Sequence, residues 1–181
     1  MKERISDTGF RLMGIVMKIM EWLHPHAENR ARTFGIQEGM TVVDYGCGPG
    51  RYTMAFAELV GKQGKLLAVD LSKLALEAIE KKVKANGLDN VQFYLAEGYD
   101  SHIDSSTSDM VIALDMFFMI QNPKQFLEEL SRISKPDAIL IIDDGHQSRE
   151  KTKRKITDAG VWKIIEEKKD HLKCKKISET V

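Results

Sequence analysis

Three glycines, Gly46, Gly48 and Gly50, stand at alternate positions shortly after an acidic residue, Asp44. Glycines in such a turn let the backbone approach a ligand where a β-carbon would collide with it. A second acidic residue, Asp70, ends the next apolar run. In a doubly wound sheet, a carboxylate at that point reaches the two ribose hydroxyls of an adenosine-containing ligand. These residues therefore predict a site for a ligand that contains adenosine.

The spacing of the glycines narrows the choice of ligand. A dinucleotide site favours the pattern G-x-G-x-x-G, but Arg51 stands where the third glycine of that pattern would be. The chain also lacks a Tyr-x-x-x-Lys pair or a similar set for hydride transfer. A nicotinamide-dependent oxidoreductase is therefore the weaker of the readings that this segment allows.

The segment Val43–Gly50 resembles the first motif of the class I S-adenosylmethionine-dependent methyltransferases, (V/L)-(D/E)-x-G-x-G-x-G. Three further segments resemble later motifs of the same family and follow in the same order. They are Leu67–Ser72, Leu95–Gly98 and Ser108–Ala113. The likeness extends over roughly residues 40–143. The chain is thus similar to this family in fold and cofactor, and the likeness says almost nothing about the acceptor.

The resemblance implies S-adenosylmethionine as the cofactor and assigns roles to individual residues. Asp44 and the glycine-loop amides suit the ammonium and carboxylate of its amino-acid tail. Asp70 would hold the ribose, Leu71 would pack against adenine, and Glu97 would approach the adenine amino group. The full set of expected cofactor contacts is Asp44, Tyr45, Gly46, Cys47, Gly48, Gly50, Asp70, Leu71, Glu97, Gly98 and Asp115.

Methyl transfer is an in-line displacement, so alignment of the reacting atoms does much of the work. A base is needed only where the acceptor must lose a proton. Asp115 and His146 follow two of the expected strands and are the candidate catalytic residues. Asp115 can equally contact the cofactor tail or a backbone amide, and His146 can be an ordinary surface residue. The residues from Met116 to Met119 are expected to line an apolar acceptor pocket.

From Thr41 onward, short apolar runs alternate with amphipathic ones, which is typical of a parallel sheet covered by helices. Strands are expected at 41–45, 65–70, 91–96, 110–114, 138–142, 161–168 and 172–177, and helices at 51–60, 72–86, 123–133 and 148–159. The prediction is a three-layer, doubly wound α/β sandwich with a seven-stranded, mostly parallel sheet. The strand order and an antiparallel last strand are implied by the resemblance alone. A loop of a different shape is expected at Lys135-Pro136-Asp137-Ala138, where the family usually has Lys-Pro-Gly-Gly.

Residues 1–40 are expected to form a helical extension ahead of a methyltransferase domain at 41–181. Between Phe10 and Leu23 the charged residues lie on one narrow stripe of an otherwise apolar helix, so that helix must be mostly covered. It is too short and too interrupted by charge to span a bilayer. It is either a lid over the acceptor or a part of the core.

Composition gives no sign of a macromolecular partner. The chain has 181 residues, which suits one domain, and its formal net charge is zero, so nothing points to nucleic acid or an anionic membrane. The two cysteines, Cys47 and Cys174, lack metal-ligand spacing, and no metal site is predicted. No secretory signal is evident, and we expect a cytoplasmic protein.

These observations predict an S-adenosylmethionine-dependent methyltransferase that acts on a small, fairly apolar acceptor. The alternative from a different class is a non-catalytic module that binds S-adenosylmethionine as a sensor or partner subunit. The absence of a dedicated acceptor domain in the sequence keeps this alternative open. Turnover of the cofactor distinguishes the two.

Overall fold

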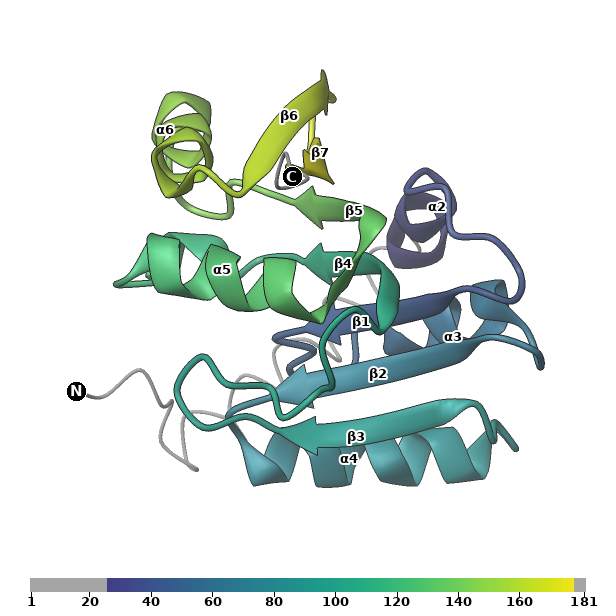
Figure 1. Cartoon of the computed structure of the whole chain (residues 1–181). Coiled ribbons are helices and arrows are strands. Elements are labelled where there is room, and N and C mark those ends of the chain that lie inside the picture. Colours follow the sequence, from purple (N-terminus) through teal and green to yellow (C-terminus); the bar gives the residue numbers. More distant parts are fainter. Residues whose placement is uncertain (1–25, 178–181) are drawn as a thin grey trace. The chain divides into compact units, whose positions relative to one another are not determined.

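The structure is a computed structural model that describes residues 26–177 (Figure 1). The expected helix between Phe10 and Leu23 lies outside the described residues. The chain divides into two compact units, residues 1–96 and residues 97–181. Within the described residues, no helix is long and apolar enough to cross a membrane.

The first unit contains a parallel sheet and the helices that connect its strands. Its elements are α2 (His26–Arg32), β1 (Thr41–Tyr45), α3 (Thr53–Val60), β2 (Lys65–Asp70), α4 (Lys73–Ala85) and β3 (Val91–Leu95). Strand β2 lies between β1 and β3 and is parallel to both. Strands β1 and β2 are buried along almost their whole length, as is usual for parallel strands with both faces covered.

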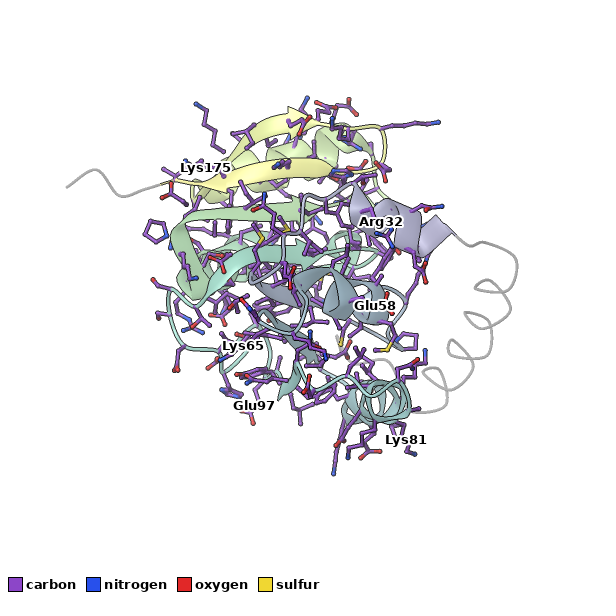
Figure 2. All side chains as sticks on the ribbon, turned by 90° about the vertical axis from the view of Figure 1, so that its right-hand side faces the viewer. Arg32, Glu58, Lys65, Lys81, Glu97 and Lys175 are labelled. Atoms are coloured by element: carbon purple, nitrogen blue, oxygen red, sulfur yellow. The ribbon has the colours of Figure 1, made fainter. Side chains whose placement is uncertain are left out.

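Helix α4 begins and ends where its sequence predicts. The hydroxyl of Ser72 accepts a hydrogen bond from the amide of Ala75 and so caps the first turn. Asn86 is the C-cap, and the chain turns away at Gly87. The outward faces of the helices carry charged side chains such as Glu58 on α3 and Lys81 on α4 (Figure 2).

The second unit contains the remaining strands. Its elements are β4 (Ser108–Ala113), the 3-10 helix η1 (Phe117–Met119), α5 (Pro123–Ile133), β5 (Ser134–Ile142), α6 (Arg149–Ala159), β6 (Trp162–Glu167) and β7 (Leu172–Lys176). Strands β4 and β5 are parallel. Strand β7 is antiparallel both to β5 and to β6.

The passage from α5 to β5 differs from the expectation of a loop at Lys135-Pro136-Asp137-Ala138. These residues all belong to β5, which begins at Ser134, directly after α5. The register with β4 shifts between the pair Ser108–Ser134 and the pair Met110–Ile139, so the proline lies at an irregularity of the strand. Proline is tolerated there because its missing N–H interrupts no regular ladder.

Across the described residues the sheet has seven strands in the order β3-β2-β1-β4-β5-β7-β6. Of these, β7 is the strand that runs antiparallel to its neighbours. The predicted α/β fold with a mostly parallel, seven-stranded sheet and an antiparallel strand at the end of the chain is therefore confirmed.

Candidate functional site

The loop between β1 and α3 carries the three glycines, and its own backbone holds it in shape. The amides of Gly46 and Cys47 donate to the carbonyl of Val69 at 2.8 and 3.1 Å, and the amide of Gly50 donates to the carbonyl of Cys47 at 3.0 Å. The amide of Gly48 donates to the Asp70 carboxylate. We expected these amides to bind the tail of the cofactor. In this structure they donate within the protein, so they fix the loop.

Two of the glycines serve different needs. At Gly50, where φ is +82°, a β-carbon would lie 2.9 Å from Cγ1 of Ile79, so glycine lets the loop pack against α4. The ammonium of Lys82, also on α4, donates to the carbonyl of Pro49 at 2.8 Å and strengthens this contact. At Gly48, where φ is +51°, the one described atom within 4 Å of an added β-carbon is the carbonyl oxygen of Gly46, at 4.0 Å. As far as residues 26–177 are concerned, a ligand can approach the backbone in front of Gly48.

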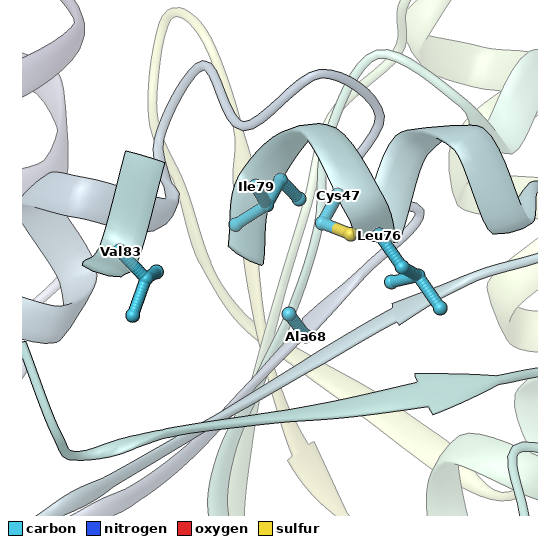
Figure 3. Packing of buried hydrophobic residues seen from close by; sticks show 5 residues of the cluster. All are labelled: Cys47, Ala68, Leu76, Ile79 and Val83. Carbon is cyan, nitrogen blue, oxygen red and sulfur yellow. The ribbon is translucent and has the colours of Figure 1, made fainter. Parts of the chain in front are cut away.

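The side chain of Cys47 points into the core of the first unit. It packs with Ala68, Leu76, Ile79 and Val83 beneath α4 (Figure 3). Burial, together with the charges of Asp44 and Asp70, raises the pKa of the Cys47 thiol well above its usual range, so the thiol is neutral. Cys47 thus anchors the loop by its side chain and can face a ligand only with its backbone.

Asp70 ends β2 and uses both carboxylate oxygens to fix the turn that follows and the loop beside it. Its Oδ2 accepts from the amide of Gly48 at 2.9 Å and its Oδ1 from the amide of Ser72 at 2.8 Å. Burial raises the pKa of the carboxyl, and hydrogen bonds from the backbone of Ser72, Gly48 and Leu71 oppose the rise. The two carboxylate oxygens have about four acceptor positions between them, so a position remains for a ligand hydroxyl beside these donors. The expected ribose contact stays a prediction.

Asp44 is buried, with 6% of its surface exposed, although it is a carboxylate. The hydroxyl of Thr53 donates to its Oδ2 at 2.8 Å. Burial raises the pKa of Asp44 to about 7; the Thr53 hydrogen bond opposes this rise and the negative charge of Asp70 adds to it. A buried carboxylate close to neutrality in pKa suits a cationic partner, because the partner's charge favours the ionised form.

The surroundings of the other predicted residues in the first unit say less about their expected contacts with the cofactor. Tyr45 is buried at the end of β1, and Leu71 is half-buried directly after β2. The packing of Leu71 against adenine stays a prediction. Thr53 was absent from the expected site residues. The sequence offers one signal that could have identified Thr53, which is its place in the first turn of the helix after the glycine loop.

In the second unit, Asp115 and His146 follow β4 and β5. The amide of Asp115 donates to Oδ1 of Asp143 at 2.8 Å, and the backbone of Asp115 has a φ of 57°. This conformation is unusual outside glycine and is often found at functional sites. The ring of His146 meets the ring of Phe118 edge-to-face, with centroids 4.9 Å apart. The segments after the two strands therefore come together, with Asp115 and His146 exposed.

The expected acceptor pocket is partly corrected by the second unit. Phe117 is fully buried and packs against Phe126, with ring centroids 5.9 Å apart. The ammonium of Lys155 lies 4.9 Å from the Phe117 ring centroid. Phe117 is thus a core residue of the second unit and not the exposed pocket residue that we expected. Met119, by contrast, is 48% exposed, and Phe118 is half-buried.

Glu97 and Gly98 open the second unit as an exposed turn (Figure 2). The amide of Glu97 donates to the carbonyl of Asp100, and the amide of Asp100 donates back, at 2.9 and 3.1 Å. The contact of Glu97 with adenine stays a prediction. Among residues 26–177 no group of three or more His, Cys, Asp or Glu side chains is arranged to hold a metal ion.

Residues 36–178 match the family described as "Methyltransferase domain". The chain belongs to this family. The resemblance found in the glycine loop and the three later motifs is thereby confirmed. The match extends over most of the methyltransferase domain that we expected at 41–181.

Individual relatives of this methyltransferase domain agree with the assignment. It is 32% identical over 113 residues to a demethylmenaquinone methyltransferase of Geobacillus stearothermophilus, over 61% of this chain and 47% of that protein. It is 29% identical over 144 residues to the enzyme of the same name from Geobacillus kaustophilus, over 77% and 58%. The chain spans about half the length of these relatives. A crystal structure of a SAM-dependent methyltransferase from Aquifex aeolicus has a TM-score of 0.80 and 26% identity, over 89% of this chain and 98% of that one.

Proposed function

We propose that the chain binds S-adenosylmethionine and transfers its methyl group to a small, fairly apolar acceptor. One observation carries the proposal. In a member of the methyltransferase-domain family, the Asp70 carboxylate holds the glycine loop and keeps an acceptor position for a ligand hydroxyl, and no described residue comes closer than 4.0 Å to a β-carbon placed on Gly48. When bound, the cofactor supplies a methyl group activated by a sulfonium centre.

The residues of the first unit would bind the two ends of the cofactor. Asp70 would accept a hydrogen bond from the ribose where its backbone donors leave an acceptor position open. Asp44 would face the ammonium group of the amino-acid tail. The amides of Gly46, Cys47, Gly48 and Gly50 already donate within the protein, so we no longer assign the tail carboxylate to them.

The acceptor side is assigned to the segments after β4 and β5. The relatives named demethylmenaquinone methyltransferases support a small and apolar acceptor. Phe118 and His146, which meet edge-to-face, offer an aromatic surface for such a molecule. Asp115 and His146 would act as bases only if the acceptor must lose a proton.

Calorimetry tests the cofactor, and turnover tests the reaction. The protein should bind S-adenosylhomocysteine with a dissociation constant of about micromolar order, and NAD far more weakly. Tighter binding of NAD would overturn the proposal. Transfer of labelled methyl from the cofactor to a component of a metabolite extract would establish an enzyme. Binding without any transfer across such extracts would favour a non-catalytic binding module.

A further inference from the structure

We propose that Thr53 is a positioning residue, whose hydroxyl holds the Asp44 carboxylate in place for the ammonium group of the cofactor's amino-acid tail. The inference rests on the proposed function, because it assumes a ligand with that tail. Thr53 itself would not touch the ligand, since its side chain is fully buried.

The contact between Thr53 and Asp44 joins two elements behind the glycine loop. Thr53 is the first residue of α3, and Asp44 lies on β1. The Oγ1–Oδ2 distance is 2.8 Å, which is short and typical of a hydroxyl that donates to a carboxylate. The same Oγ1 lies 3.6 Å from the position of a β-carbon on Gly50. Thr53 therefore lies against the loop as well as against the carboxylate.

A buried threonine in the first turn of a helix often serves the helix itself, but Thr53 does not. The N-cap of α3 is Tyr52, whose side chain makes no capping hydrogen bond in the described part of the chain. The Thr53 hydroxyl donates to the neighbouring strand, where it orients a side chain. The Thr53 hydroxyl therefore serves Asp44 and not its own helix.

The charges around Asp44 show why the contact matters for binding. Among the groups that act on the carboxyl, Asp70 is of like charge and opposes ionisation, while Thr53 favours it. Cys47, on the loop beside it, is a neutral thiol and adds no charge. Burial raises the pKa of Asp44 to about 7, and the Thr53 hydroxyl favours the ionised form against that rise before a cation arrives. Without the hydroxyl, the carboxyl of Asp44 would take up a proton more readily. A ligand with an ammonium group would then have to displace that proton in order to bind.

The experiment compares two ligands on three variants at pH 7. S-adenosylhomocysteine carries the amino-acid tail, and 5′-methylthioadenosine lacks it. Thr53→Val removes the hydroxyl, and Thr53→Ser keeps it. Thr152→Val is the matched control, because Thr152 is also fully buried in the first turn of a helix but donates to Ser148 of its own helix.

We expect Thr53→Val to lower the affinity for S-adenosylhomocysteine about tenfold. The affinity for 5′-methylthioadenosine should stay within about twofold of the wild-type value. Thr53→Ser should bind S-adenosylhomocysteine with the wild-type affinity, and Thr152→Val should leave the affinities for both ligands unchanged. The loss in Thr53→Val should shrink as the pH rises from about 7 to about 8.5, because Asp44 then ionises without the hydroxyl.

An equal loss of affinity for both ligands in Thr53→Val would show a merely structural role and overturn the inference. Unchanged affinities in Thr53→Val would overturn it as well. If Thr53→Val does not fold, Thr53→Cys replaces it, since a thiol is a weak donor of similar size. Failure of the wild-type protein to bind S-adenosylhomocysteine at all would instead refute the proposed function. The two failures are therefore distinguishable.

Discussion

Asp70 holds the glycine loop, and we propose that the same carboxylate binds the ribose, so its replacement should affect both stability and binding. Asp70→Ala removes acceptors for the amides of Gly48 and Ser72, and hydrogen bonds to a charged group are worth about 1.5–3 kcal/mol each. We expect cofactor affinity to fall at least tenfold and the melting temperature to fall as well. Calorimetry and thermal melts measure the two effects. An unchanged dissociation constant would place the ribose elsewhere.

The buried Asp44 makes stability depend on pH. Its folded pKa of about 7 lies above the ordinary value of 3.8 for an aspartate, so between these values the folded state binds more protons than the unfolded state. The contribution of Asp44 is therefore most favourable below about pH 4 and is lost as the pH rises through about 7. Asp44→Asn removes this dependence.

We expect the unfolding free energy of Asp44→Asn, relative to the wild-type protein, to rise between pH 4 and pH 7 by on the order of a few kcal/mol. Urea denaturation of both proteins at several pH values measures the difference. A difference that stays constant with pH would show that Asp44 is ionised throughout the range.

The same variant should bind S-adenosylhomocysteine more weakly, since the amide lacks the charge that faces the ammonium.

At the scale of elements, the contact between the glycine loop and α4 holds the loop in shape. Gly50→Ala places a β-carbon 2.9 Å from Cγ1 of Ile79 and requires a φ of +82° of a residue with a side chain. We expect a loss of about 2 kcal/mol or more in stability, together with weaker cofactor binding. Denaturant titration and calorimetry follow both.

Gly87→Ala is the matched control for Gly50→Ala. Gly87 also has a positive φ, +65°, but no described atom lies within 4 Å of its added β-carbon. It lies just after α4. This variant should show the backbone strain alone, about 1 kcal/mol, and unchanged cofactor affinity. Equal losses in the two variants would show that the approach to Ile79 has no effect of its own.

At the scale of the whole molecule, several expectations remain predictions. The division into an extension at 1–40 and a domain at 41–181 is one, and the lid or core role of the helix between Phe10 and Leu23 is another. That helix lies outside the described residues. A cytoplasmic location also stays a prediction. The family match at 36–178 and the order of the seven strands agree with the expected fold of the later part of the chain.

The sequence alone was sufficient for the elements and the family. Strand and helix periods, the cap at Ser72 and the proline at the start of α5 are local signals, and the observed bounds agree within a few residues. The start of β5 is the exception, because a strand that begins beside a proline depends on its pairing with β4. The glycine motif identified the family because its residues are consecutive in the chain.

Only the tertiary structure decided how the site is held together. Gly48 and Asp70, Pro49 and Lys82, and Asp44 and Thr53 meet through the packing of different elements. No periodicity of a single segment predicts such pairs. The inward direction of Cys47 and the burial of Phe117 have the same origin, since each depends on which neighbours fill the space around it. A motif therefore names the residues of a site, and packing assigns what each side chain does.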